Sequence, residues 1–528
     1  HYQPLWTLVG GGVFPKEETE RNEADYIPDG ASWVRDAVVG CLTRRPPRQL
    51  QAPPNPPTPW PRTPPRAGAA PRRVVVVGGG VGGAAIAALL ARAGHRVTLL
   101  EARSTVGGRA SSGSSQGFTY DMGVHLCGHG ALGPAARVAR EVGADLRWMD
   151  DEMSFLLRCG DRERVFRRDV KDLGELVALA AVAGVAPSSA AAAARALGAL
   201  MFARRVEDVA PLDGLTVREY LARFTDDPGV VQLMEVMCLL LLCVPADVAS
   251  AGEFAWCFSA LARVGHISYP VGGVQQVPTS YARAARTHGA TVLTNAPVSR
   301  IVVEGGRVRG VEADRFFPAD WVISNAGIKK TVTLVGEDHL PADYLERVSG
   351  LVESFSAVTI KYGLDRPLMS EQAVLEYDPS PRLSTRFEAG DPVCPMAFVV
   401  APSDPTQAPE NMQLVVAGAL QPRSALEGTG ERELIGLLHQ RVCRIIPGLE
   451  EHLVVRVDTG ASTISRISGR ATADVLGVGQ RFDQVGGNRP DVTTPVEGLF
   501  LVGCDAGGRG VGIEQAADSA LNLANRLS

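Results

Sequence analysis

The stretch Val74–Arg109, which reads VVVVGGGVGGAAIAALLARAGHRVTLLEARSTVGGR, decides the fold of this chain. Its four opening valines run into a turn that carries Gly78, Gly80 and Gly83 in the spacing G-x-G-x-x-G. Glycines so spaced allow a tight turn, a close approach of backbone to a pyrophosphate, and close packing of the following helix on the strand. The N-terminus of that helix offers free N–H groups and the positive end of its dipole to phosphates.

The second half of the stretch completes a strand–helix–strand unit. Small and aliphatic residues predict a helix up to Ala93, and Gly94 is placed to stop it. The segment Arg96–Leu100 predicts a second strand, which ends on Glu101. An acid at this position can hold both ribose hydroxyls of an adenosine. Because a carboxylate would repel a 2′-phosphate, the sequence predicts a dinucleotide site and argues against NADP.

The residues after Glu101 indicate which nucleotide is bound. Glu101–Arg109 resembles the E-x(5)-G-G-R extension of the flavoprotein superfamily of amine oxidases, protoporphyrinogen oxidases and phytoene desaturases. The resemblance implies FAD as the cofactor, with Gly108 and Arg109 over the pyrophosphate and flavin and Arg103 among the binding residues. NAD enzymes lack this extension.

Two further blocks carry the same resemblance. The block 265–313 contains Tyr-Pro-Val-Gly-Gly, a predicted helix over 277–287 and predicted strands over 292–293, 298–303 and 307–312. In the family, the residue matching Val298 contacts adenine through its backbone. The sequence ADWVISNA, residues 319–326, resembles the strand that follows, and together these features favour the phytoene dehydrogenase-like branch.

The C-terminus, GLFLVGCDAGGRGVGIEQAADSALNLANRL, resembles the family's last segment. A strand over 499–502 is expected to lead to a final helix from about residue 511. The resemblance places an acid on the ribityl or phosphate side of the flavin and aims the N-terminus of the last helix at the isoalloxazine, where positive potential stabilises reduced flavin. The residues that match are Gly503, Asp505, Gly512 and Ile513. For Asp505, simple N-terminal capping is the alternative.

Composition limits the functional classes. The chain has 528 residues, 45% of them hydrophobic, and a formal charge of −5, which suits two domains and gives no electrostatic case for nucleic acid. Nine scattered cysteines without C-x-x-C favour a reducing cytoplasm. The longest apolar runs, 176–187 and 236–245, fall short of the roughly 20 residues that span a bilayer. We therefore expect a cytoplasmic protein, with peripheral membrane contact left open.

The chain divides by composition into four parts. Residues 1–43, beginning HYQPLWTLVGGG, resemble an internal segment of sulfide:quinone oxidoreductases, lack a nucleotide site and are expected to have no activity. Residues 44–72 are rich in proline and arginine and predict a linker. The fold class predicted for the rest is α/β, with a Rossmann-like FAD-binding domain of the GR2 type and an interleaved α+β substrate domain. The FAD-binding domain is assigned to 73–150, 265–330 and 485–528, and the substrate domain to 151–264 and 331–484.

Few side chains are candidates for catalysis, because a bound flavin accepts the hydride itself. His125 is a weak candidate for a base, since its segment should border the flavin, although a histidine bonded to backbone is the alternative. His266 and Glu514 are weaker still. His125 and His129 lie four residues apart, but in glycine-rich sequence without an acidic ligand nearby, so no metal is predicted. Amine oxidases hold a lysine near the flavin, but Lys361 is out of register with that position.

The leading hypothesis is an FAD-dependent oxidoreductase that dehydrogenates an apolar, isoprenoid-like or polyene substrate, as in carotenoid biosynthesis, by hydride transfer to flavin N5. One alternative is an amine or protoporphyrinogen-type oxidase on the same fold. Another is a non-catalytic FAD-binding partner protein. The sequence holds one complete nucleotide fingerprint, so electrons are expected to leave to oxygen, a quinone or another diffusible acceptor.

Overall fold

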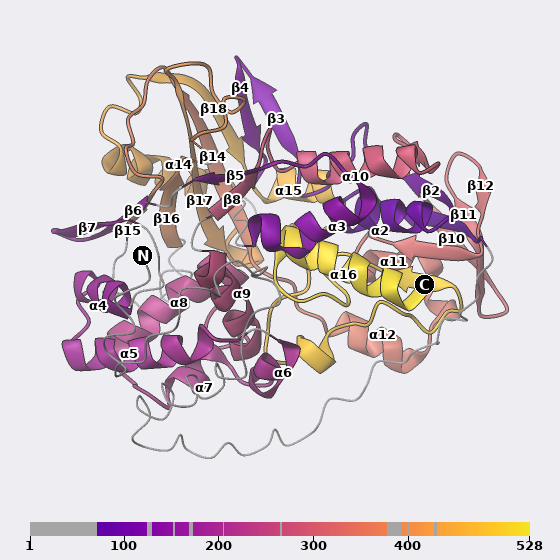
Figure 1. Cartoon of the computed structure of the whole chain (residues 1–528), viewed down its shortest axis with the longest axis horizontal. Helices are drawn as coiled ribbons and strands as arrows, with labels where there is room; N and C mark the ends of the chain where they lie inside the picture. Colours follow the sequence, from indigo (N-terminus) through magenta and orange to yellow (C-terminus); the bar gives the residue numbers. More distant parts are fainter. Residues whose placement is uncertain are drawn as a thin grey trace, which may run out of the picture.

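The computed structural model describes residues 71–123, 129–151, 154–167, 173–203, 205–264, 267–376, 393–399, 402–426 and 430–527. Two lobes make up this part of the chain (Figure 1). One lobe holds a parallel sheet with helices packed on it. The other holds a larger mixed sheet and a cluster of helices. Among the described residues, no helix is both long and apolar enough to cross a membrane.

The parallel sheet is assembled from segments far apart in the sequence. Its strand order is β19-β13-β1-β2-β9, and every neighbouring pair is parallel. Val74–Val77 are all buried, as expected for a strand covered on both faces. The strands are β1 (Arg73–Val77), β2 (Arg96–Leu100), β9 (Thr291–Leu293), β13 (Trp321–Ser324) and β19 (Leu499–Leu501). The predicted Rossmann-like α/β class is confirmed.

Small side chains bring the helices of this lobe close together. Helix α2 (Val81–Arg92) contacts α10 (Gln276–Thr287) and α16 (Gly512–Leu527), and its alanines are buried. Gly94 follows α2 with φ of +90°, which confirms the predicted helix stop. Helix α3 (Pro134–Val142) packs on α16.

A small antiparallel sheet lies beside the parallel one. It consists of β10 (Arg300–Glu304), β11 (Arg307–Glu312) and β12 (Phe316–Pro318). The predicted strand over 298–303 was placed two residues too early, because pairing with β11 begins only at Arg300 opposite Glu312. Val298 therefore lies in the preceding loop.

The mixed sheet of the second lobe has the order β18-β14-β17-β16-β15-β6-β7. Its centre is fully buried, and α14 (Gly430–Ile445) packs on β14 through Leu434, Leu438 and Val442. The turn residues Cys159–Asp161 predict a hairpin over 152–168, and the described residues 154–167 form it. The strands are β18 (Leu453–Thr459), β14 (Ser356–Leu364), β17 (Gln413–Gln421), β16 (Val393–Phe398), β15 (Ala373–Glu376), β6 (Ser154–Cys159) and β7 (Arg162–Arg167).

The helices between residues 171 and 264 form a cluster below the mixed sheet (Figure 1). Its core contains Phe254, Phe258 and Leu239. Asp227 caps α8 by accepting from the N–H groups of Gly229 and Val230. The helices are α4 (Leu173–Val182), α5 (Pro187–Leu200), α6 (Val206–Val209), α7 (Val217–Leu221), α8 (Pro228–Leu242) and α9 (Ala251–Val264).

The remaining elements are short. Two small antiparallel pairs occur: β3 (Ser112–Ser115) with β4 (Phe118–Asp121), and β5 (Trp148–Asp151) with β8 (Ile267–Pro270). The remaining α-helices are α11 (Ile328–Val335), α12 (Ala342–Ser349) and α15 (Ala461–Ser468). The segments assigned to the FAD-binding domain supply every strand of the parallel sheet, and those assigned to the substrate domain supply every strand of the mixed sheet. The exact domain boundaries stay a prediction.

A buried ion network joins the helical cluster to the loop before α16. The Arg509 guanidinium donates to Asp213 at 3.0 Å and to Glu253 at 3.1 Å. Arg489 donates to Glu253 at 3.3 Å and to Gln480 at 2.6 Å. Glu253 is fully buried, and its carboxylate accepts from both of these arginines.

Candidate functional site: a dinucleotide cavity between the lobes

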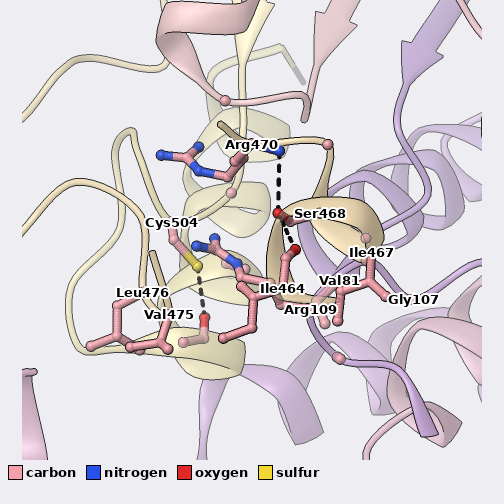
Figure 2. A pocket seen from close by; sticks show the side chains of 18 of the residues that line it. Val81, Gly107, Arg109, Ile464, Ile467, Ser468, Arg470, Val475, Leu476 and Cys504 are labelled. Atoms are coloured by element: carbon pink, nitrogen blue, oxygen red, sulfur yellow. Dashed lines mark hydrogen bonds between the residues drawn. The ribbon is translucent and has the colours of Figure 1, made fainter. Parts of the chain in front are cut away.

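A cavity of about 620 Å³ lies between the two lobes, within the size range of ligand sites. One side is formed by the carboxyl ends of the parallel strands and by the N-terminal ends of α2 and α16. The other side is formed by α8, β14, β16, β17 and the segment from α15 to residue 476. Figure 2 shows part of this lining, where Arg109 and Cys504 lie near Ile464 and Leu476.

The glycine turn follows the predicted pattern. Gly78 has φ of +96°, a conformation that glycine adopts without strain, and its N–H donates to the carbonyl of Leu100 at 2.8 Å. Gly83 does not line the cavity. A Cβ on Gly83 would lie 2.0 Å from the carbonyl oxygen of Gly78, so this glycine lets α2 pack directly under the turn. Gly78 and Gly80 both line the cavity.

Glu101 reaches the cavity from the end of β2. The N–H of Gly79 donates to its Oε2 at 2.7 Å, and the N–H of Arg103 donates to its Oε1 at 2.8 Å. These bonds fix the carboxylate, which is 7% exposed, and each oxygen keeps a further lone pair. The arrangement fits an acid that accepts from ribose hydroxyls. The Arg103 guanidinium donates to Ser111 at 2.9 Å.

The Gly-Gly-Arg loop lies against the glycine turn. The N–H of Gly107 donates to the carbonyl of Gly79 at 2.9 Å, and Gly107 pairs with Gly80 in a short parallel bridge. This contact brings Gly108 and Arg109 to the cavity wall. The backbone of both loops therefore faces the same part of the cavity, an arrangement that suits the binding of a pyrophosphate.

Arg109 belongs to a buried chain of charges that the sequence did not reveal. Its guanidinium forms an ion pair with Asp474. Asp474 accepts from Arg470 at 2.6 Å, and Arg470 donates to Asp505 at 2.7 Å. Burial alone would raise the pKa of Asp474, but Arg109 and Arg470 hold it at about 2. Asp474 is therefore an ionised anchor that fixes the position of Arg109.

Asp505 is held by both lobes. Besides the ion pair with Arg470, its Oδ2 accepts from the N–H of Ile328 at 2.9 Å and its Oδ1 from the N–H of Val478 at 3.0 Å. Ile328 begins α11, so Asp505 caps that helix and not the one that follows it in sequence. Asp505 therefore makes an N-terminal contact with α11, and it also lines the cavity.

The N-terminal turn of α16 contributes Gly512, Ile513 and Glu514 to the cavity wall. The Glu514 side chain is 4% exposed, and its Oε2 accepts from the N–H of Ala135 at 3.0 Å. Its Oε1 has no hydrogen-bond partner among the described residues. Burial raises the pKa of Glu514 to about 7, so this carboxyl is largely protonated below neutral pH.

Lys361 lies behind the cavity wall on β14. Its ammonium donates to the carbonyl of Met122 at 2.7 Å and to the hydroxyls of Thr359 and Thr459 at 2.6 Å each. Ala357 and Thr359 line the cavity, whereas Lys361 does not. All three protons of a charged Lys361 are thus used inside the protein, which leaves none for a ligand.

The structure gathers almost all of the predicted binding residues in one place. The residues that line the cavity are Gly78, Gly80, Glu101, Arg103, Gly108, Arg109, Val298, Gly503, Asp505, Gly512 and Ile513. His125 and His266 lie outside the described residues. Among the residues missed, Asn325 donates to the carbonyl of Gly78 at 3.3 Å, and its place directly after β13 in the Ser-Asn-Ala sequence was the available signal.

Comparison with known proteins agrees with this geometry. The zeta-carotene-forming phytoene desaturase of Myxococcus xanthus is 28% identical over 84% of this chain and 91% of its own length. The crystal structure of an oxidoreductase from Methanosarcina mazei superposes with a TM-score of 0.69 at 21% identity, over 86% of this chain and all of that one, which shows the shared fold.

A separate short match confirms the resemblance predicted for residues 1–43. The mitochondrial sulfide:quinone oxidoreductase of Dictyostelium discoideum is 60% identical over 39 residues, which is 7% of this chain and 9% of that protein. Residues 1–70 lie outside the described part of the structure.

The family model for flavin containing amine oxidoreductases matches residues 81–528. The cofactor is FAD, and the acid after β2, the paired glycine loops and the helix N-terminus at the cavity suit its adenosine, pyrophosphate and flavin. This chain belongs to the flavin containing amine oxidoreductase family and is an FAD-dependent oxidoreductase.

Proposed function

We propose that this oxidoreductase dehydrogenates a carbon–carbon bond of an apolar, isoprenoid-like or polyene substrate. The observation that carries the proposal is the character of the cavity wall supplied by the second lobe. Leu239 and Leu240 of α8, Met396 of β16 and Leu420 of β17 all line it. An aliphatic wall favours a hydrocarbon chain because it offers dispersion contacts and no polar partner.

The same wall offers little to an organic cation. No aromatic side chain is among the described residues that line the cavity. Alkylammonium groups are commonly bound over aromatic faces or beside carboxylates. Lys361 is the lysine closest in sequence to the amine-oxidase position, and it donates its hydrogen bonds to protein oxygens. These observations favour the apolar substrate over an amine.

Bound FAD supplies a hydride acceptor at flavin N5, and the substrate proton leaves to water or a weak base. The chain's own residues position and shield the reactants. Gly512 and Ile513 present N–H groups and the positive end of α16 to the cavity, which favours negative charge there. Burial raises the pKa of Cys243, which also lines the cavity, to about 12, so this side chain stays a neutral thiol.

The similarity to the Myxococcus xanthus protein supports the same substrate class. That relative is named for forming zeta-carotene from phytoene, a polyene, and the match spans nearly its whole length. At 28% identity, the substrate itself is a matter for experiment.

The test begins with the absorption spectrum of the purified, gel-filtered protein and the mass of the released cofactor, which should be that of FAD. Anaerobic bleaching of the flavin by phytoene in detergent micelles is expected, followed by reoxidation with a quinone or oxygen. Leu240→Gln should slow the bleaching without loss of FAD. The matched control is Leu437→Gln on the outer face of α14, which should behave as wild type.

The alternatives give different results in the same assay. Bleaching by amines with release of peroxide, and none by phytoene, would overturn the proposal in favour of an amine oxidase. Bound FAD that no donor reduces would instead indicate a non-catalytic FAD-binding partner. Equal rates for wild type and Leu240→Gln would refute the role given to the aliphatic wall.

A further inference from the structure

Three potential metal ligands meet on the second lobe, away from the dinucleotide cavity. His439 and Cys443 lie one turn apart on α14, and Glu450 lies in the turn after that helix. One ligand atom from each lies within 4.8 Å of the other two. None of the three lines the cavity between the lobes. In Figure 1, α14 lies on the opposite side of the mixed sheet from the parallel-sheet helices.

The distances between these atoms approach the edges of a tetrahedral zinc site. The distance from His439 Nε2 to Glu450 Oε1 is 3.3 Å, and from His439 Nε2 to Cys443 Sγ it is 3.8 Å. Zinc bonds of about 2.0–2.1 Å to nitrogen, about 2.0–2.2 Å to oxygen and about 2.3 Å to sulfur give tetrahedral edges of roughly 3.3–3.6 Å. The third edge, from Cys443 Sγ to the Glu450 carboxylate, lies within 4.8 Å, so side-chain shifts of up to roughly 1 Å close the site.

Tyr362 of β14 orients the histidine. Its hydroxyl lies 3.0 Å from His439 Nδ1, and the two rings stack with centroids 5.8 Å apart. With the proton on Nδ1 donated to the tyrosine oxygen, Nε2 is the free ligand atom, and it is the nitrogen nearer Glu450. Metal-binding histidines usually have their second nitrogen held in this way.

We propose that His439, Cys443 and Glu450 bind one thiophilic divalent cation of the Zn²⁺ class, with a water molecule in the fourth position. The site is open on one side because the Glu450 side chain is 71% exposed, whereas that of His439 is 16% exposed. Binding replaces the thiol proton: Cys–SH and Zn²⁺ give Cys–S–Zn and one released H⁺. This site departs from the expectation of no metal drawn from the sequence.

A metal here ties together three elements of the second lobe. The cation joins the last turns of α14 to the turn that contains Glu450, and through His439 and Tyr362 it also rests on the central strand β14. Such a site stabilises the folded chain, because an ion that binds only the native state raises the midpoint of unfolding. The site is independent of the proposed substrate.

The test uses the FAD-bound protein with reduced thiols and Co²⁺ as a spectroscopic probe. Co²⁺ bound by a thiolate gives charge-transfer absorption, read as a difference spectrum against the metal-free flavoprotein. We expect this absorption in wild type and its loss in Cys443→Ser. Cys159→Ser, which removes a thiol elsewhere in the lobe, is the control and should keep it.

Zn²⁺ affinity measured by competition with a chromophoric chelator gives a second readout. We expect one Zn²⁺ per chain, at least about tenfold weaker binding in Glu450→Gln, and 10–100-fold weaker binding in Tyr362→Phe. Because Glu450 is exposed, its replacement should leave the fold intact. Absence of the cobalt absorption in wild type, its survival in Cys443→Ser, or unchanged Zn²⁺ affinity in Glu450→Gln would overturn the proposal.

Discussion

Replacing Glu514 by glutamine should remove a pH-dependent loss of stability from the wild-type protein. Burial raises the pKa of Glu514 from its ordinary 4.5 to about 7. Below pH 4.5 the carboxyl is protonated in both the folded and the unfolded chain. Between pH 4.5 and 7 only the unfolded chain ionises, so the free energy of unfolding falls as pH rises. A shift of this size lowers the free energy of unfolding of the wild-type protein by about 3 kcal/mol. This loss is complete above pH 7.

The assay is urea unfolding of the FAD-bound protein at pH 5 and pH 8. From pH 5 to pH 8, the free energy of unfolding of Glu514→Gln minus that of wild type should grow by roughly 2 to 3 kcal/mol. The glutamine keeps an oxygen for the N–H of Ala135, and its amide occupies the place of the unpartnered Oε1. The exposed Glu433→Gln is the control and should give no such change. A difference that is equal at both pH values, or reversed, would refute the buried protonated carboxyl.

Three other changes test the cofactor site. Gly83→Ala should abolish or strongly reduce FAD content, measured by flavin absorbance, because the new Cβ would lie 2.0 Å from the carbonyl oxygen of Gly78. Asp474→Asn should lower the free energy of unfolding by about 3 kcal/mol or more, measured with urea, because Arg109 and a second buried arginine lose their shared charge partner. Deletion of residues 1–70 should leave FAD content unchanged, since the predicted nucleotide site begins after them.

A specific result would contradict each of these three predictions. Full FAD content in Gly83→Ala would mean that α2 can shift away from the turn. Wild-type stability in Asp474→Asn would mean that the two ion pairs of Asp474 contribute no net stability. Loss of FAD on deletion of residues 1–70 would show that the segment resembling sulfide:quinone oxidoreductase takes part in the fold.

The cofactor end of the site could be predicted because its signals are local. The glycine turn, the helix stop at Gly94 and the acid at Glu101 all lie within one strand–helix–strand unit, where the spacing of residues fixes their geometry. The resemblance then added Val298 and Asp505, which lie hundreds of residues away, and the structure brings both to the same cavity.

The charged anchor of the site could not be predicted, because its partners are brought together only by the tertiary fold. Arg109 and Asp474 are 365 residues apart in the sequence and follow no motif. The apolar, β-branched stretch 352–365 predicts a strand from Val352, and the start of β14 is misplaced for a related reason. Val352 is apolar enough for a strand, yet it is 47% exposed and the neighbouring Glu353 bridges to Val478, so the strand begins only at Ser356.

The buried ion network between the lobes restricts how a substrate can enter. Swinging the helical cluster away from the loop before α16 would separate Arg509 from Asp213 and Glu253 and leave charges in an apolar interface. Such an opening costs several kcal/mol, so it would be rare at equilibrium. We therefore expect the substrate to enter through local movement of the chain around the cavity. The two lobes keep their relative positions throughout catalysis.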